Sequence, residues 1–239
     1  MAAAIIMSDS HVHAQLALQA WLSPAYPVGA YAYSHGLETA VEKGTVHDAA
    51  SLEDWLNDIL RHGSGWNDAV FIAEATRTHG ELQGDTWIVA LCERAELACA
   101  MTGTAEMRQE CLQQGTAFLD ITCKAWPHAE LDALSENIGA NTAYPVCFGA
   151  AAAAHGCDPV QTINGYLFAM LSNWVSAAVR MNIVGQSAGQ QIAAALVSRI
   201  EAITAAALVS SIDDLGGCSF LNEIASFHHE TQNARLFRS

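Results

Sequence analysis

Lysine and proline are scarce in this chain of 239 residues, which contains only two lysines and five prolines. Ten basic residues stand against 25 acidic ones, and the formal net charge is −15. Such an acidic surface repels nucleic-acid phosphates and anionic lipid, so we expect neither a nucleic acid nor a membrane as partner. Cations and proteins with basic faces are the natural partners, although solubility alone also accounts for a charge of this sign.

The patterns of disulfide scaffolds and zinc sites are also missing. The seven cysteines are odd in number and form no C-x-x-C pair, which argues against a secreted disulfide scaffold and against structural zinc. The first residues lack the basic segment and the long apolar stretch of a signal peptide. No apolar run approaches the ~18 residues of a membrane span. These features favour a cytoplasmic location.

What the chain does contain is apolar and rich in alanine. Hydrophobic residues make up 51% of the sequence and charged residues 15%, and alanine is the best helix former. We therefore predict an all-α fold, with residues 1–239 forming a single domain of roughly ten helices packed as a bundle. A flexible N-terminal segment (about 1–10) and a C-terminal tail (about 230–239) flank it. The expected helices are 11–22, 34–43, 51–62, 66–78, 86–101, 104–124, 142–155, 158–181, 186–208 (one or two) and 219–228.

Caps and apolar spacing support several of these helices. Ser51 is placed as an N-cap followed by acids in the first turn. Leu52, Trp55, Leu56, Ile59 and Leu60 then form a one-sided apolar stripe. Asp158-Pro159 opens a long helix with proline at a favourable first-turn position. Alanine runs such as 150–154 permit close helix approach, and helices that are apolar on several faces make a homo-oligomer plausible.

Motifs for nucleotide chemistry and hydrolysis are absent. The sequence contains no G-x-x-x-x-G-K-[ST], no G-x-G-x-x-G and no G-x-S-x-G. Ser34 and His35 place a hydroxyl beside an imidazole, and a hydrolase that uses this pair is one alternative. Neighbours in sequence point in different directions on a helix, however, so local roles are favoured for both.

Ten histidines raise the alternative of a metal-binding protein. His11 and His13 form one dense group, and His228 and His229 form the other. Neither has the i,i+4 spacing of a zinc helix, although His-x-His can hold a borderline cation weakly. Exposed or capping histidines are the favoured interpretation.

The C-terminal residues 229–239 combine two arginines with leucine and phenylalanine. Arginine and aromatic side chains are frequent in protein interfaces. Two alternatives are open: a flexible tail that becomes ordered when a partner docks, or a tail packed on its own domain.

Four blocks of sequence carry a resemblance to a known family. They are SPAYPVGAYAYSHGLE at 23–38, SNWV at 172–175, VGQSAGQ at 184–190, and HETQ with RLFRS at 229–232 and 235–239. In these blocks, and in their order, the chain resembles the urease accessory protein F family. The resemblance spans nearly the whole chain.

The resemblance implies an all-α, dimeric protein without enzymatic activity of its own. Family members join the accessory protein D/H and the GTPase accessory protein G on apo-urease. The complex delivers nickel to a dinickel centre with a carbamylated lysine, and the F protein is expected to regulate the GTPase. No cofactor is expected to bind tightly to this chain, and nickel would be handled transiently by the complex. The alternative within this resemblance is a nickel-binding metallochaperone that acts through its own histidines, His11 and His13 or His228 and His229.

The resemblance also implies which residues bind partners. Tyr31 and Arg235 match positions that arrange the tail and recruit the GTPase, and a guanidinium can stack on a phenol or hydrogen-bond to it. The stretch from Asn164 to Phe168 matches a dimerisation and GTPase-contact region. The remaining expected contacts are Leu236, Phe237 and Arg238 in the tail. Three positions depart from the family pattern, namely Ala30, Asn164 and Asn233.

Overall fold

The computed structural model describes residues 9–82 and 84–239. In this part of the chain the regular structure is entirely helical, which confirms the predicted all-α class. The helices, in chain order, are α1 (Asp9–Trp21), η1 (Ala30–Ala32), α2 (Leu37–Glu42), α3 (Ala49–His62), α4 (Ser64–Glu81), α5 (Asp85–Ala100), α6 (Ala105–Ala125), α7 (Ala129–Asn137), α8 (Tyr144–Ala154), α9 (Pro159–Arg180), α10 (Gln186–Ala195), α11 (Val197–Ala207), η2 (Ile212–Asp214) and α12 (Phe220–His229). None of the helices within the described ranges has both the length and the apolar character needed to cross a membrane.

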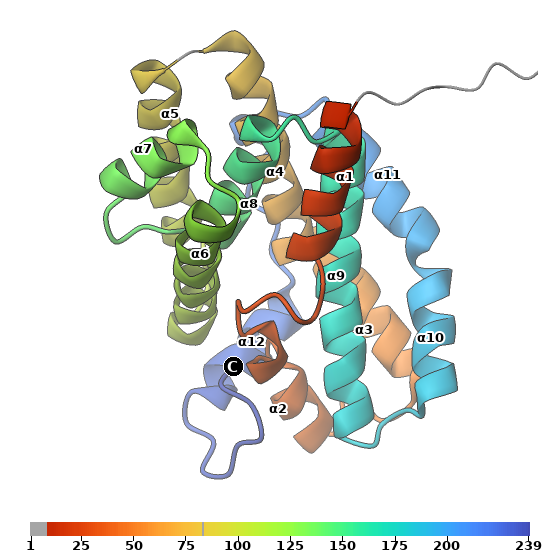
Figure 1. Ribbon diagram of the computed structural model, residues 1–239. Helices are drawn as coiled ribbons and strands as arrows, with labels where there is room; N and C mark the ends of the chain where they lie inside the picture. Colours follow the sequence, from red (N-terminus) through yellow and green to blue (C-terminus); the bar gives the residue numbers. More distant parts are fainter. Residues whose placement is uncertain (1–8, 83) are drawn as a thin grey trace, which may run out of the picture.

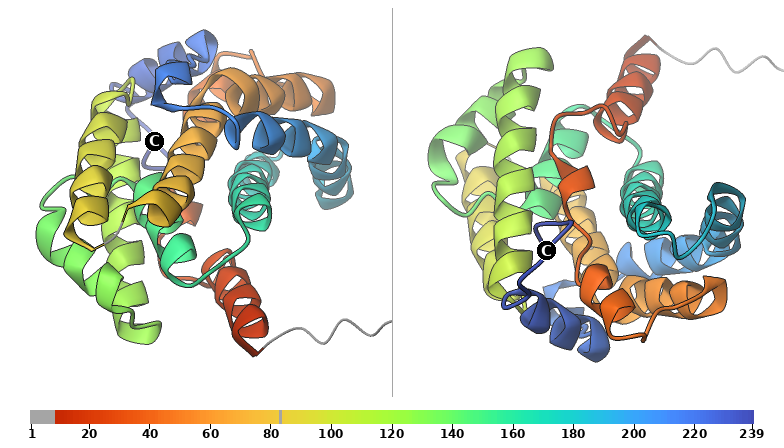
Figure 2. Two further views of the ribbon diagram at one scale, coloured as in Figure 1. Left: turned by 90° about the horizontal axis from the view of Figure 1, so that it is seen from above. Right: turned by 90° about the horizontal axis from the view of Figure 1, so that it is seen from below.

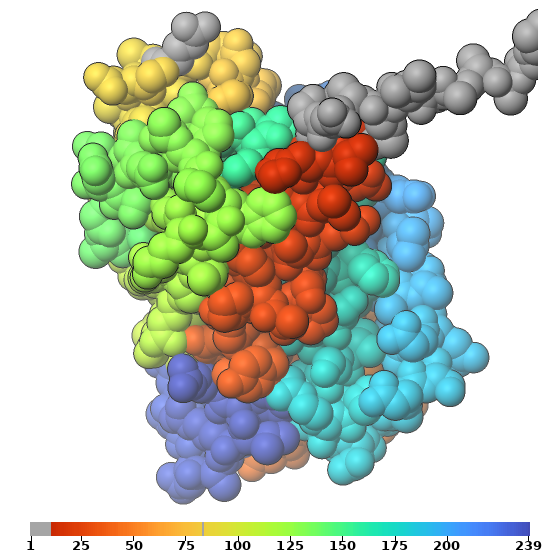
Figure 3. Space-filling model, viewed as in Figure 1, coloured from red at the N-terminus to blue at the C-terminus, as the bar shows by residue number. Residues whose placement is uncertain are grey.

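Helices α4 and α8 pack against each other at the centre of the molecule (Figure 1). On one side of this pair lie α5, α6 and α7, and on the other lie α3, α9 and α11, with α10 beside α9. The short helix α2 packs against α12 at one end of the molecule (Figure 2). Figure 3 shows α1 and the segment that follows it running between the two groups of helices. That segment therefore reaches both halves of the fold.

Helix α8 is buried on all sides. Its nine residues from Pro145 to Ala153 are buried, and a Cβ atom added at Gly149 would lie 2.9 Å from the Cβ of Ala75 on α4. The alanine run 150–154 thus brings two helices close together inside the monomer, as small side chains allow. The apolar faces of α8 pack within this chain. They therefore give no support to the expectation of a homo-oligomer.

Helix α3 begins two residues earlier than predicted, and its N-cap lies three residues earlier. The N-cap is Asp48 rather than Ser51, because the Asp48 carboxylate accepts a hydrogen bond from the Ser51 amide at 2.9 Å. Ser51 returns the contact by accepting from the Asp48 amide at 3.0 Å, so the two residues form a capping box. The predicted apolar stripe is confirmed, and all five of its members are buried: Leu52, Trp55, Leu56, Ile59 and Leu60.

Two further helix predictions need correction. The predicted helix 34–43 begins only at Leu37, because His35 and Gly36 adopt positive φ angles of 57° and 80°. Helix α7 is missing from the prediction, since only Leu131 and Leu134 of its nine residues are buried. With α7 and the division of 186–208 into two helices, the described residues contain twelve α-helices where roughly ten are expected.

Candidate functional site

The C-terminal tail, residues 230–239, packs on the protein's own domain, which is the second of the two arrangements considered for it. The Ser34 amide donates a hydrogen bond to the Ser239 carbonyl oxygen at 2.8 Å. The Arg238 amide donates to the Ala32 carbonyl oxygen, also at 2.8 Å. The tail is therefore paired with the 30–36 segment, about 200 residues away in sequence, through backbone bonds. That the tail becomes ordered on docking stays a prediction.

Phe237 is the apolar anchor of the tail. Its side chain is only 4% exposed, and the guanidinium of Arg180 lies 4.4 Å from the centre of its ring. Arg180 also donates to the Tyr31 carbonyl oxygen at 2.7 Å. The arginine that links Tyr31 to the tail is therefore Arg180 on α9, whereas Arg235 contacts other groups.

A single carboxylate, that of Glu38 on α2, receives the middle of the tail. One oxygen accepts from the Leu236 amide at 2.7 Å and the other from the Phe237 amide at 2.9 Å. The second oxygen also lies 3.2 Å from Nε2 of His229. Hydrogen bonds to a charged acceptor are the stronger kind. Glu38 thus holds two adjacent tail amides that would otherwise lack a partner in the fold.

His229, fully buried at the end of α12, links Glu38 to a second carboxylate. Its Nδ1 lies 2.6 Å from Glu106 on α6, and the other oxygen of Glu106 accepts from Arg235 at 2.7 Å. Both ring nitrogens of His229 lie within hydrogen-bonding distance of carboxylate oxygens. Glu38, His229, Glu106 and Arg235 therefore form one connected polar network, which we call the tail network.

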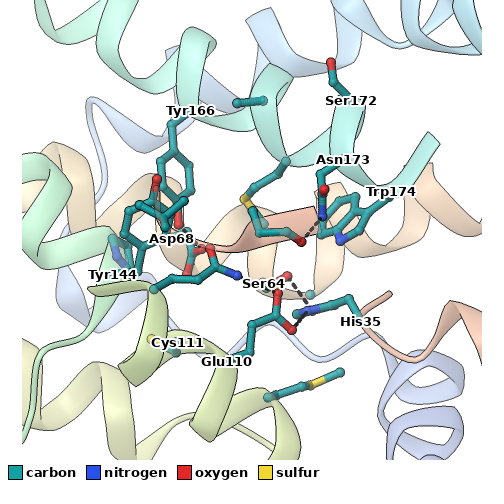
Figure 4. Close-up of a pocket in the computed structure, with 18 of the residues that line it drawn as sticks. His35, Ser64, Asp68, Glu110, Cys111, Tyr144, Tyr166, Ser172, Asn173 and Trp174 are labelled. Carbon is teal, nitrogen blue, oxygen red and sulfur yellow. Dashed lines mark hydrogen bonds and ion pairs between the residues drawn. The ribbon is translucent and has the colours of Figure 1, made fainter. Parts of the chain in front are cut away.

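A second buried group lies under the end of the tail (Figure 4). Glu110 accepts from the Ser239 hydroxyl at 2.8 Å and lies 3.3 Å from Nδ1 of His35, while its other oxygen accepts from Gln114 at 3.0 Å. Nε2 of His35 lies 3.0 Å from the Ser64 hydroxyl at the start of α4. The order Ser64, His35, Glu110 resembles that of a hydrolytic triad.

The electrostatics of this group oppose hydrolysis. Burial lowers the pKa of His35, but the charge of Glu110 and the hydrogen bond to it, with a contribution from Asp68, raise the pKa above its ordinary value. A raised pKa favours the protonated imidazole, and in that form the ring cannot accept a proton from a serine hydroxyl. The Ser34 hydroxyl donates to the Ser239 carbonyl oxygen, so the alternative of a Ser34–His35 dyad is wrong. Both serines hold structure in place.

A cavity of about 670 Å³ opens beside His35 and Ser64. The segment after α1 forms one wall, and residues of α4, α5, α6, α8, α9 and α12 contribute the others. Figure 4 shows part of this lining. Within it, the Tyr166 hydroxyl donates to the carboxylate of Asp68 at 2.8 Å. The pKa of Asp68 is raised to about 7, mainly because burial removes the carboxylate from water. The cavity thus contains a carboxylate that resists ionisation.

The raised pKa of Asp68 predicts a pH-dependent loss of stability. An aspartate that titrates at 3.8 when unfolded and at about 7 when folded keeps its proton longer in the folded state. Stability therefore falls as pH rises from about 4 to about 7 and is level above that. Asp68→Asn keeps an acceptor for Tyr166 but cannot ionise. We expect it to be more stable than wild type at pH 8 by a few kcal/mol, at about 1.4 kcal/mol per pH unit between the two pKa values.

Urea unfolding of both proteins at pH 5 and pH 8 tests this expectation. The stability difference between Asp68→Asn and wild type should be larger at pH 8. Asp54→Asn, on the exposed side of α3, is the matched control and should show no such change. A difference that is equal at both pH values would contradict the assignment of the proton to Asp68.

The seven residues expected to bind partners differ in how far their side chains are exposed. Large exposed fractions are found at Tyr31 (71%), Leu236 (64%) and Phe168 (42%). The two tail arginines, Arg235 and Arg238, are also exposed. Phe237 is buried, and Asn164 is partly buried, accepting from Thr204 at 2.7 Å. The Arg238–Ala32 bond brings Tyr31 next to the tail, while Asn164 and Phe168 lie separately on α9. Partner binding by all seven stays a prediction.

Sequence reasoning misses the residues that hold the tail. Glu38, Glu106 and Glu110 are partly or fully buried acids, and none of them is predicted as a site residue. The buried His35 is considered only in the hydrolase alternative. Glu38 and His35 do fall in the first family-like block, which is the only signal in the sequence. The His35–Glu110 contact spans 75 residues and the Glu38–Phe237 contact spans 199.

The histidine pairs proposed for metal binding are not assembled into a chelating group. His228 is exposed, while its neighbour His229 is buried between two carboxylates. His11 and His13 are exposed on α1, and the ring of His13 lies 5.4 Å from that of Trp126. Among the described residues, no group of three or more His, Cys, Asp and Glu side chains could hold a metal ion.

Comparison with known proteins gives a consistent result. A family model described as UreF matches residues 46–197. The urease accessory protein UreF of Methylobacterium radiotolerans is 47% identical over 224 residues, which cover 94% of this chain and 96% of that protein. The protein of the same name from Agrobacterium fabrum is 47% identical over 232 residues, 97% of this chain and 99% of that protein. The one from Rhodopseudomonas palustris strain BisB18 is 44% identical over 233 residues, with coverages of 98% and 95%.

Proposed function

Because the chain belongs to the urease accessory protein UreF family, we propose that it is a non-enzymatic adaptor in urease maturation. In this role it joins the D/H-type and GTPase G-type accessory proteins on apo-urease and promotes nickel insertion into the urease active site. The relatives are named as accessory proteins rather than as urease subunits, which supports a role outside catalysis. The absence of nucleotide-binding motifs in the sequence agrees with a GTPase activity that belongs to the partner.

The proposal includes a homodimer that works in the cytoplasm and regulates the GTPase of its partner. Nickel passes transiently through the complex, and this chain keeps no tightly bound cofactor. Neither a nucleic acid nor a membrane is a partner, in keeping with the net charge of −15. In the dimer we assign a contact to Phe168, which is 42% exposed on α9, with Asn164 one turn earlier on the same helix.

The observation that carries the proposal is the surface around the docked tail. Leu236 is 64% exposed and Tyr31 71%, although the backbone on both sides of each is held in place. Helix α12, which leads into the tail, exposes four large apolar side chains, which are Phe220 (69%), Leu221 (60%), Phe227 (53%) and Ile224 (39%). Several exposed apolar side chains on one short helix are typical of a protein-binding surface. We assign this surface to the accessory partners.

Arg235→Ala tests the tail as the recruiting element. The change removes the bond to Glu106 and two bonds to the tail backbone, at Gln232 and Glu230. We expect it to weaken capture of the purified G-type protein by about tenfold or more and to change the melting temperature far less. Arg61→Ala, an exposed arginine on α3, is the matched control and should leave both values unchanged.

A chain truncated before Glu230 extends the test. It should fail to capture the G-type protein, and urease activation should drop with it. Full capture and normal nickel loading by the truncated chain would contradict the proposal. Equilibrium dialysis against Ni²⁺ addresses the alternative of a metallochaperone. Tight, stoichiometric binding that is lost in a His11→Ala, His13→Ala double variant would favour that alternative.

A further inference from the structure

The cavity beside His35 has the size and the walls of a small-molecule site. Its volume of about 670 Å³ falls within the range of ligand pockets, about 300–1,000 Å³. Aromatic side chains make up much of the lining, among them Trp21, Tyr26, Phe71, Tyr144 and Tyr166. Figure 4 shows Asp68, Tyr144 and Tyr166 together on one side of the cavity. Tyr31 and Phe168, assigned above to partner contacts, also lie in the lining of this cavity.

The charge of the lining is of one sign. Its carboxylates are Asp68, Glu110 and Glu223, and the described lining residues include neither a lysine nor an arginine. The one basic side chain is His35, which is bonded to Glu110 and to Ser64. An anionic ligand would find no free positive group here, and burial would make its repulsion by the carboxylates strong.

Asp68 and Tyr144 offer the groups that a cation would use. One oxygen of Asp68 accepts from Tyr166, and no described residue bonds to the other. The Tyr144 hydroxyl likewise bonds to no described residue, and its ring centre lies 5.4 Å from that of Tyr166. In Glu110, by contrast, both oxygens are already hydrogen-bonded. Asp68 thus presents a free oxygen to the cavity beside aromatic rings, and the positive group that acts on it, His35, makes its own hydrogen bonds to Glu110 and Ser64.

We propose that this cavity binds a small organic ammonium ion, whose charged group pairs with Asp68 and Tyr144 and whose apolar part packs against the aromatic walls. A cation over the face of an aromatic ring is attracted by the ring quadrupole, and apolar carbon is favoured by the same walls. A compact metal cation needs several polar ligands at short range, and the described residues contain no such group. The inference is independent of urease and of the other accessory proteins.

Binding in this site depends on the protonation of Asp68. The titratable groups that face its carboxylate are His35 from the segment before α2, Glu110 and Cys111 from α6, Tyr144 from α8 and Tyr166 from α9. The pKa of Asp68 is raised to about 7 by burial. An ammonium ion favours the ionised carboxylate, so binding releases a proton near neutral pH and weakens as pH falls below about 7.

Calorimetric titration of the whole chain with benzylamine tests the proposal. At pH 8, benzylamine is a cation, and benzyl alcohol is a neutral compound of the same shape. We expect saturable binding of benzylamine that is about tenfold or more tighter than that of benzyl alcohol, because a hydrogen bond to a charged group is the stronger kind. Binding should weaken at pH 5.5, where benzylamine keeps its charge and Asp68 loses its own.

Asp68→Asn should lose about tenfold or more of the benzylamine affinity, while the control Asp54→Asn should bind as wild type does. Tyr144→Phe keeps the ring and removes the hydroxyl, and we expect a smaller loss of a few fold. Melting curves recorded beside each titration separate loss of binding from loss of folding. Equal affinity for the alcohol and the amine, unchanged binding by Asp68→Asn, or displacement of benzylamine by equimolar NiCl₂ alone would each overturn the proposal.

Discussion

Replacing Gly115 with alanine is expected to cause a large loss of stability, about 3–5 kcal/mol. Gly115 lies on α6 where the loop before α8 crosses that helix. A Cβ atom at this position would collide with the carbonyl oxygen of Thr142 and approach the Tyr144 amide nitrogen to 2.9 Å. These are backbone atoms, so no side-chain rotation relieves the collision. Either the loop moves away or α6 shifts.

Movement of the loop would break bonds on both sides of the glycine. The Thr142 hydroxyl donates to the Leu112 carbonyl oxygen at 3.2 Å and is bonded to the Thr116 hydroxyl at 2.6 Å. The same loop leads directly into α8, the buried centre of the fold. Displacement at Thr142 is therefore transmitted to the most tightly packed helix, and the expected drop in melting temperature is on the order of 10 °C.

Gly80→Ala is the matched control for this measurement. Gly80 lies near the end of α4, is exposed, and has no atom within 4 Å of an added Cβ. Alanine is the better helix former, so this change should stabilise the protein slightly, by at most about 1 kcal/mol. Thermal and urea unfolding of both variants followed by circular dichroism separates the two cases. If Gly115→Ala has the same melting temperature as wild type, the loop does not approach α6 as closely as described.

The predictable part of this fold is the part that local chemistry decides. The apolar stripe of α3 and the Asp158 cap of α9, with Pro159 in its first turn, involve residues within one or two helical turns. Sequence spacing is enough to find them. Helix α7 fails this test because a helix of nine residues with two buried leucines leaves little periodic signal. Its N-cap, His128, is also an uncommon capping residue.

The unpredictable part is the site, because its contacts join distant segments. Nothing near Glu38 in the sequence indicates that its carboxylate will meet amides 198 and 199 residues later. The same holds for His229, whose partners Glu38 and Glu106 are 191 and 123 residues away. The adjacent pair His228-His229 suggests a metal site. The two residues lie on different faces of α12, however, so the ring of His228 faces solvent and the ring of His229 lies in the core. The family resemblance identifies the blocks and leaves these pairings open.

Glu38→Gln is expected to release the tail from the domain while the helical core stays folded. The amide keeps only one oxygen to accept from the Leu236 and Phe237 amides, and its NH₂ group is turned toward His229 or toward one of those donors. Loss of a hydrogen bond to a charged acceptor costs about 1.5–3 kcal/mol. Hydrogen exchange at the Leu236 and Phe237 amides should therefore be about tenfold to a hundredfold faster.

Glu42→Gln is the matched control, because Glu42 lies at the exposed end of the same helix, α2. It removes one negative charge and should leave exchange at both tail amides unchanged. If the docked tail recruits the G-type partner, capture should fall in Glu38→Gln and not in Glu42→Gln. Faster exchange with undiminished capture would show that the partner binds elsewhere. Unchanged exchange in Glu38→Gln would instead show that Phe237 and the Ser34–Ser239 pairing hold the tail without the carboxylate.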